Sequence, residues 1–95
     1  MNYEKELEKL FDMVINENAS DLHLSEGRYP TIRISGQLIP IVSSQILTHQ
    51  DIKEFVNFMT PKAAIKDFDT NVVELDFSYK YKDKARFRCN AYHQQ

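Results

Sequence analysis

The last quarter of the chain constrains the fold most strongly, because it contains two runs of alternating residues. Residues 72–81 (VVELDFSYKY) and 85–93 (ARFRCNAYH) flank a short polar turn made of Lys82, Asp83 and Lys84. A period of two is typical of β-strands, whose successive side chains point to opposite faces of a sheet. This segment therefore predicts a β-hairpin.

The second of these strands separates polar from apolar side chains. One face receives Arg86, Arg88, Asn90 and Tyr92, and the other receives Ala85, Phe87, Cys89 and Ala91. Two arginines at positions i and i+2 leave the same face about 7 Å apart. Such a pair can grip a phosphate or pair with carboxylates. Glu74 and Asp76 on the first strand are candidate cross-strand partners. Arg33 has the same two interpretations, namely binding of a phosphate or pairing with a carboxylate.

The rest of the chain shows both helical and strand periodicity. Helices are expected over 3–16, from Thr48 to Met59, and from Thr60-Pro61 onward with Ala64, Ile65 and Phe68 as its apolar face; strands are expected over 20–25, 31–35 and 38–42. Thr48 and Asp51 have the spacing of a capping box, and Pro40 places its strand at an edge or bulge. This order predicts an α+β fold, with helices packed on one face of an antiparallel sheet.

Composition narrows the class of protein. The 95 residues are enough for one domain, and 12 basic against 14 acidic residues argue against nucleic acid or an anionic membrane as the main partner. The N-terminal segment has no signal-peptide pattern, and no apolar run approaches the ~20 residues of a membrane span. A cytoplasmic protein is therefore expected. Cys89 is the single cysteine and is expected to be a buried, unbridged thiol.

The familiar catalytic and binding motifs are absent from the sequence. Neither glycine lies in a phosphate-binding loop, and no nucleophile motif or cysteine pair occurs. Asp21 and His23 share a strand face but have no partner at ligand spacing, so we expect a structural or hydrogen-bonding role and no metal site. His49 follows a helix N-cap and is expected to be exposed, whereas the pattern assigns no role to His93. Spacing alone therefore predicts a soluble α+β domain with an arginine-bearing face.

Two dense segments resemble the type IV pilus retraction ATPases. Residues 19–41 (ASDLHLSEGRYPTIRISGQLIPI) are similar to the family's A-S-D-L-H-L, its proline-containing loop, I-R, a short turn and L-x-P. Residues 74–95 (ELDFSYKYKDKARFRCNAYHQQ) are similar to its E-L-D-F-S-Y, a turn and A-R-F-R-x-N. The turn departs from the family pattern, because Lys82-Asp83-Lys84 stands where a glycine is usual.

The resemblance implies that residues 1–95 are a single N-terminal, PAS-like domain of a hexameric ATPase for pilus retraction and twitching motility. The RecA-like catalytic domain, with its ATP and Mg²⁺, is then expected downstream and absent from this chain, so the chain alone is not expected to be an enzyme. The implied partners are that C-terminal domain, neighbouring subunits and the inner-membrane pilus platform protein, without nucleic acid or membrane insertion. The implied location is cytoplasmic, peripheral to the inner membrane.

The resemblance also assigns expected roles to single residues. Arg88 matches the arginine of R-x-N, which is implied to approach the terminal phosphates of ATP held by the catalytic domain, and Arg86 lies beside it. The resemblance thus implies a domain that closes over ATP and transmits motion between subunits. The interface or structural candidates are Asp21, His23, Arg33, Glu74 and Asp76. A stand-alone PAS-like sensor and a protein-interaction adaptor are the alternatives.

Overall fold

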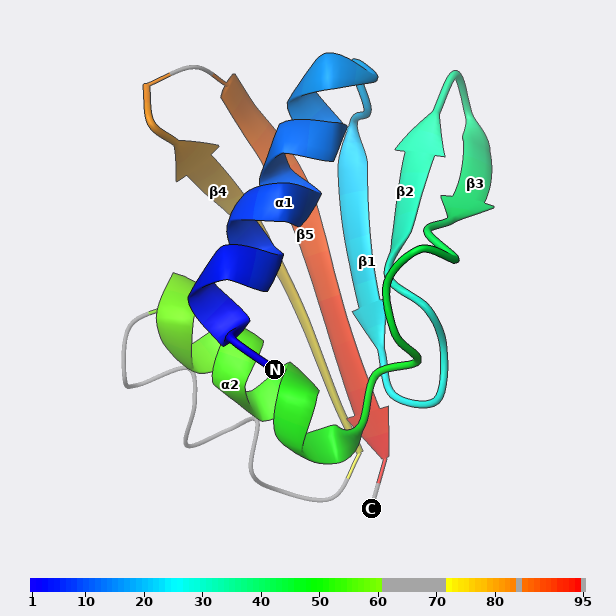
Figure 1. Cartoon of the computed structure of the whole chain (residues 1–95), viewed down its shortest axis with the longest axis vertical. Helices are drawn as coiled ribbons and strands as arrows, with labels where there is room; N and C mark the ends of the chain where they lie inside the picture. The colour runs from blue at the N-terminus through cyan, green and yellow to red at the C-terminus, as the bar shows by residue number, and fades with distance from the viewer. Residues whose placement is uncertain (61–71, 84, 95) are drawn as a thin grey trace.

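The structure is a computed structural model that describes residues 1–60, 72–83 and 85–94, and Figure 1 shows its helices and strands. The elements are α1 (Tyr3–Asn16), β1 (Asp21–Ser25), β2 (Thr31–Ile34), β3 (Gln37–Pro40), α2 (His49–Met59), β4 (Val72–Tyr81) and β5 (Ala85–Gln94). Each lies within a few residues of the range expected from its periodicity. The predicted α+β class is therefore confirmed, whereas the expected helix beyond Thr60-Pro61, with Ala64, Ile65 and Phe68, lies outside the described residues.

The five strands form one sheet in the order β3-β2-β1-β5-β4. Three neighbouring pairs are antiparallel, but β1 and β5 run parallel, with Leu22 opposite Cys89. The expectation of an antiparallel sheet is wrong at this one pair, and the sheet is mixed. Parallel neighbours need a long crossover connection. The chain between β1 and β5 supplies it, because it includes β2, β3, α2 and β4.

Helix α1 begins at a capped end and buries one stripe of side chains. The Asn2 side chain accepts a hydrogen bond from the Lys5 backbone N–H at 3.0 Å. The buried stripe has the spacing of an amphipathic helix and consists of Leu7, Leu10, Phe11 and Val14. The Phe11 ring packs against aromatic rings of the terminal hairpin, with centroids 4.9 Å from both Tyr79 and Tyr81. This contact holds α1 against the sheet.

Helix α2 has the predicted capping box. The Thr48 hydroxyl accepts a hydrogen bond from the Asp51 N–H at 3.1 Å, and the Asp51 carboxylate accepts one from the Thr48 N–H at 2.9 Å. The helix then buries Ile52, Phe55, Val56 and Met59. Both helices lie on the same face of the sheet (Figure 1), so the core forms between helices and strands.

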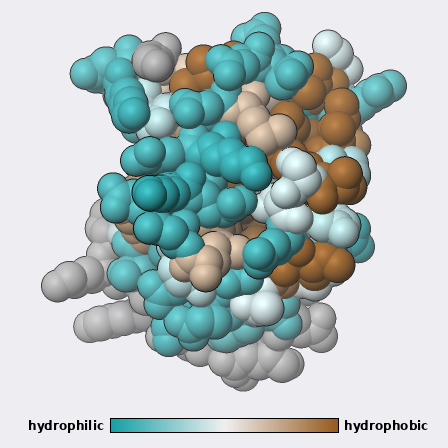
Figure 2. Space-filling view, viewed as in Figure 1, coloured by the Kyte–Doolittle hydropathy of each residue, from teal (hydrophilic) through white to brown (hydrophobic). Residues whose placement is uncertain are grey.

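The predicted position of Pro40 in an edge strand is confirmed, because β3 ends the sheet and its four residues are exposed. Figure 2 shows apolar surface gathered on the right-hand side of the molecule. In β3 and the segment that follows it, the exposed large apolar residues are Leu38, Ile39, Val42 and Ile46. Among the residues that the structure describes, no helix has the length and apolar character needed to cross a membrane.

Candidate functional site

The sheet face opposite the two helices carries most of the polar residues that the sequence singles out. Strand register aligns Arg33 of β2 with Asp21 of β1, and Asp21 with Arg88 of β5. On the far side of Arg88, the Asp76 carboxylate of β4 contacts its guanidinium. Four side chains from four strands thus form a row in which positive and negative charges alternate. We call this row the charge ladder.

Arg88 is the most strongly engaged member of the charge ladder. Its Nη2 donates a 2.5 Å hydrogen bond to Oδ2 of Asp76, which lies diagonally across the β4–β5 pair. The hydrogen bond and charge of Asp76, followed by the charge of Asp21, raise the pKa of Arg88 above its usual value. The Arg88 side chain is still 66% exposed. Asp76 therefore orients a guanidinium that an approaching anion can reach.

Arg86 lies two residues before Arg88 on the same exposed face. Its Nη1 donates to the Ser78 hydroxyl at 3.3 Å, and Asn90 makes the matching diagonal contact with the Glu74 carboxylate at 3.0 Å. Each of these three β5 side chains therefore contacts the β4 residue that lies two positions before its direct cross-strand partner. Because Arg86 contacts a neutral hydroxyl, its charge is less compensated than that of Arg88.

The other expected site residues have local partners. Ser20 donates to the Asp21 carboxylate at 2.6 Å, and His23 Nε2 lies 3.8 Å from the same carboxylate, beyond hydrogen-bond range. Arg33 donates to the Gly36 carbonyl oxygen at 3.2 Å and so supports the β2–β3 turn. The structure joins Asp21, Arg33, Arg88 and Asp76 in the charge ladder, while Glu74 pairs with Asn90 beside it.

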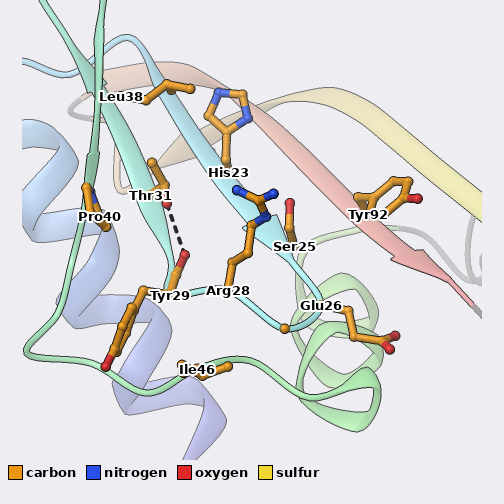
Figure 3. Close-up of a pocket in the computed structure, with 11 residues that line it drawn as sticks. His23, Ser25, Glu26, Arg28, Tyr29, Thr31, Leu38, Pro40, Ile46 and Tyr92 are labelled. Carbon is orange, nitrogen blue, oxygen red and sulfur yellow. Dashed lines mark hydrogen bonds between the residues drawn. The ribbon is translucent and has the colours of Figure 1, made fainter.

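A surface pocket of about 730 Å³ lies at one end of this face, where β1 turns into β2. Figure 3 shows the Arg28 side chain reaching from the loop across β1 toward Ser25 and His23. Thr31 fixes the loop by donating to the Tyr29 carbonyl oxygen at 3.0 Å. The pocket is therefore a partly open cleft with a cationic group in it. The sequence reasoning did not identify it, because its walls come from four separate segments.

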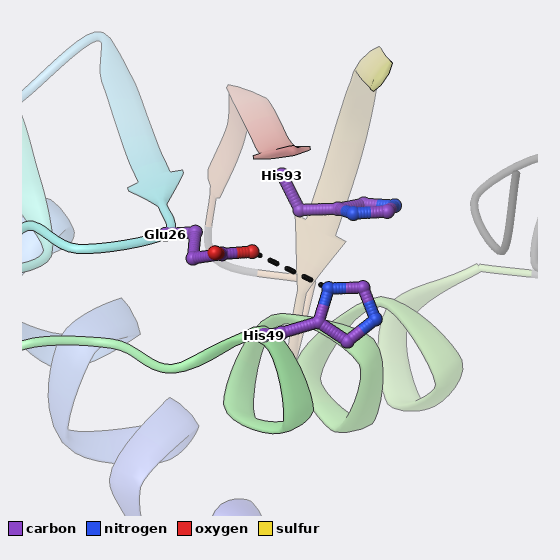
Figure 4. Close-up of side chains that lie close together, drawn as sticks. All are labelled: Glu26, His49 and His93. Carbon is purple, nitrogen blue, oxygen red and sulfur yellow. Dashed lines mark hydrogen bonds and ion pairs between the residues drawn. The ribbon is translucent and has the colours of Figure 1, made fainter. Parts of the chain in front are cut away.

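A second group missed by the sequence reasoning comprises Glu26, His49 and His93. Their possible metal-ligating atoms all lie within 4.8 Å of one another, and Figure 4 shows their side chains gathered where β1, α2 and β5 meet. The expected exposure of His49 is wrong in part, because the residue is half-buried and its Nδ1 lies 3.3 Å from the Glu26 carboxylate. His93 is fully buried. The three residues are far apart in sequence, so spacing gave no signal of this cluster.

Cys89 lies on the opposite, apolar side of β5, as its place in the alternation predicts. It is fully buried, and this burial raises the pKa of its thiol to about 12. A thiol with so high a pKa is protonated at neutral pH and is a poor nucleophile. Cys89 is therefore a core residue.

No protein-family model matches the chain. Two curated proteins of Pseudomonas aeruginosa do match it. The type IV pilus retraction ATPase PilT is 33% identical over 89 residues, which are 94% of this chain and 25% of PilT. The type IV pilus ATPase PilU is 26% identical over 90 residues, which are 95% of this chain and 23% of PilU.

The chain thus spans about a quarter of the length of the curated relatives that it matches. Because the alignments cover 89 and 90 of the 95 residues, the similarity extends over most of both segments on which the resemblance rests. The two matches confirm that resemblance, and this chain is a relative of the type IV pilus ATPases that fits an N-terminal domain of these proteins.

Proposed function

We propose that this chain is a regulatory and coupling domain of a hexameric ATPase that drives pilus retraction. In this proposal the charge ladder faces ATP held by a separate catalytic domain, and Arg88 contacts its terminal phosphates. The observation that supports the proposal is the exposed Arg88 guanidinium, which Asp76 holds in place on β5, an interior strand of the sheet. A preorganised cation near the transferring phosphoryl group stabilises the charge that develops there.

Asp76 has two effects in this proposal. It orients Arg88, and it also competes with a phosphate for the same guanidinium. A bound γ-phosphate carries more charge than one carboxylate, so it can draw Arg88 away from Asp76 when the domain closes. Arg86 starts with the neutral Ser78 hydroxyl as its partner and forms no ion pair with the described residues, so it can join the phosphate without breaking one of these. The proposed site is therefore a pair of arginines that differ in their partners before ATP binds: Arg88 is paired with a carboxylate and Arg86 with a hydroxyl.

A chimaeric motor tests the proposal. This chain replaces the matched quarter of PilT, and ATP hydrolysis is measured with Arg88→Ala, Arg86→Ala and Lys80→Ala variants. Lys80 is the matched control, because it is an exposed cation of the same hairpin that pairs with Asp83. We expect Arg88→Ala to lower kcat by at least about 10-fold, since an arginine on the transferring phosphate can contribute far more than this. Lys80→Ala should leave kcat unchanged.

Thermal unfolding of the same variants separates catalysis from folding. Arg88 is exposed, so its replacement should move the melting temperature only slightly while turnover falls. Unchanged turnover in Arg88→Ala would refute the role proposed for this residue. A loss in Arg86→Ala alone would transfer the role to Arg86.

The pocket bears on the alternative of a stand-alone small-molecule sensor. A sensor site is usually enclosed and mainly apolar, with few polar groups. This pocket is partly open, and its lining includes the charged side chains of Glu26 and Arg28. These features favour a surface that meets another protein or domain over a sensor cavity.

A further inference from the structure

Three side chains suited to metal binding converge away from the charge ladder, at the junction of β1, α2 and β5. Glu26 directly follows β1, His49 is the first residue of α2, and His93 is the penultimate residue of β5. One ligand atom from each lies within 4.8 Å of the other two. Figure 4 shows the Glu26 carboxylate directed at the His49 ring, with the His93 ring beside it.

These separations suit a single ion. Ligand atoms about 2.0–2.2 Å from a tetrahedral Zn²⁺ lie roughly 3.3–3.6 Å from each other. Glu26 Oε1 and His49 Nδ1 are already 3.3 Å apart, and the centroids of the two imidazole rings are 4.4 Å apart. Binding of one ion would require the donor atoms, now up to 4.8 Å apart, to move to within about 3.6 Å of one another. We propose that Glu26, His49 and His93 form a binding site for a divalent transition-metal ion, with Zn²⁺ as its representative.

Backbone hydrogen bonds hold the three ligand-bearing segments together. The Glu26 N–H donates to the carbonyl of Tyr92, the residue before His93, at 3.0 Å. The next N–H, of Gly27, donates to the Leu47 carbonyl at 2.8 Å, two residues before His49. The ligands are therefore positioned before an ion arrives. Such preorganisation lowers the entropy that binding must overcome.

The donor set determines which ions fit. Two neutral imidazoles and one carboxylate suit Zn²⁺ and similar first-row ions, whereas Mg²⁺ and Ca²⁺ prefer sites made of oxygen atoms alone. The positive end of the α2 dipole opposes a cation at His49, and the negative charge of Glu26 offsets it. Three protein ligands leave one tetrahedral position for water or for a donor from a partner.

The site is independent of the proposed function, because none of its ligands belongs to the charge ladder. A bound ion would connect the end of β1, the start of α2 and the end of β5. An ion that binds only the folded chain stabilises it in proportion to the logarithm of its concentration. The expected consequence is a fold whose melting temperature depends on Zn²⁺.

The test is a titration of the 95-residue chain with ZnCl₂, followed by calorimetry and by thermal unfolding. We expect one Zn²⁺ per chain and a rise in melting temperature of about 10–20 °C at 100-fold excess over Kd. Mg²⁺ should give neither effect. Co²⁺ at the same site should give the absorption of a four-coordinate ion.

Three variants locate the site. His49→Ala and Glu26→Gln should each weaken Zn²⁺ binding by at least about 10-fold, because the first removes an imidazole donor and the second replaces a charged carboxylate with a neutral amide. Both positions are half-buried, so these variants should keep the fold. His23→Ala is the matched control. His23 lies beside Asp21 on the sheet face that carries the charge ladder, so this variant should leave the affinity for Zn²⁺ unchanged. The proposal is overturned if the original chain binds no Zn²⁺, if His49→Ala binds it equally well, or if His23→Ala removes binding.

Discussion

Asp51 connects the two helices, so its removal should destabilise the fold more than its place in a short helix suggests. The residue is 8% exposed. One carboxylate oxygen accepts a hydrogen bond from the Thr48 N–H at 2.9 Å, and the other accepts one from the Tyr3 hydroxyl at 3.0 Å. Asp51→Ala removes both acceptors. It leaves a backbone donor at the start of α2 and a phenol on α1 without this partner.

The magnitude follows from these two contacts. Loss of the capping interaction costs about 1 kcal/mol, and loss of a charged acceptor from the Tyr3 hydroxyl costs about 1–3 kcal/mol. We therefore expect Asp51→Ala to lower the free energy of unfolding by about 2–4 kcal/mol. For a chain of this size, that corresponds to a fall in melting temperature of roughly 10–30 °C.

Thermal and urea unfolding followed by circular dichroism measures this loss, and Gln50→Ala is the control. Gln50 neighbours Asp51 but is exposed, and its side chain donates a hydrogen bond to Glu54 within α2. A double-mutant cycle of Tyr3→Phe with Asp51→Asn isolates the contact between the helices. An effect of Asp51→Ala no larger than that of Gln50→Ala, about 0.5 kcal/mol or less, would refute this account of how the helices are joined.

Two further predictions concern the core thiol and the β2–β3 turn. Because the pKa of Cys89 is raised to about 12, the folded thiol stays protonated while the unfolded one ionises from about pH 9 upward. The free energy of unfolding should therefore fall above pH 9 by up to about 1.4 kcal/mol per pH unit. Cys89→Ala should lack this contribution, and rapid labelling of the folded chain by a disulfide reagent at pH 8 would contradict the prediction. Ser35 and Gly36 both have positive φ, of 50° and 80°. Ser35→Asn should raise the free energy of unfolding by about 0.5 kcal/mol and Gly36→Ala should lower it by about 1 kcal/mol, whereas equal melting temperatures in both variants would contradict the turn geometry.

Local sequence signals predicted most of the elements and the faces of the strands. The capping box at Thr48 and the alternation from Ala85 to Tyr92 were informative because each depends on residues only a few positions apart. The same alternation placed Arg88 outward and Cys89 inward, as the structure confirms. The position of β3 at the edge of the sheet was predicted from Pro40, because proline has no backbone N–H to donate to a second neighbouring strand.

Properties that depend on distant segments were not predicted. Alternation tells which face a residue occupies but not which strand lies beside it, so the parallel β1–β5 pair was missed. That pair is what brings Asp21 next to Arg88. The cluster of Glu26, His49 and His93 was missed for the same reason, because three separate segments supply its members.

The position of β5 between β1 and β4 has a mechanical consequence. Its side chains alternate between the exposed arginines and the packed Phe87 and Cys89. A slip of one residue would turn every arginine inward and every core side chain out to solvent, so small shifts along the strand are blocked. A force on the Arg88 side chain should therefore be passed to β1 and β4, the two strands that are hydrogen-bonded to β5, without a slip of β5 along its own axis.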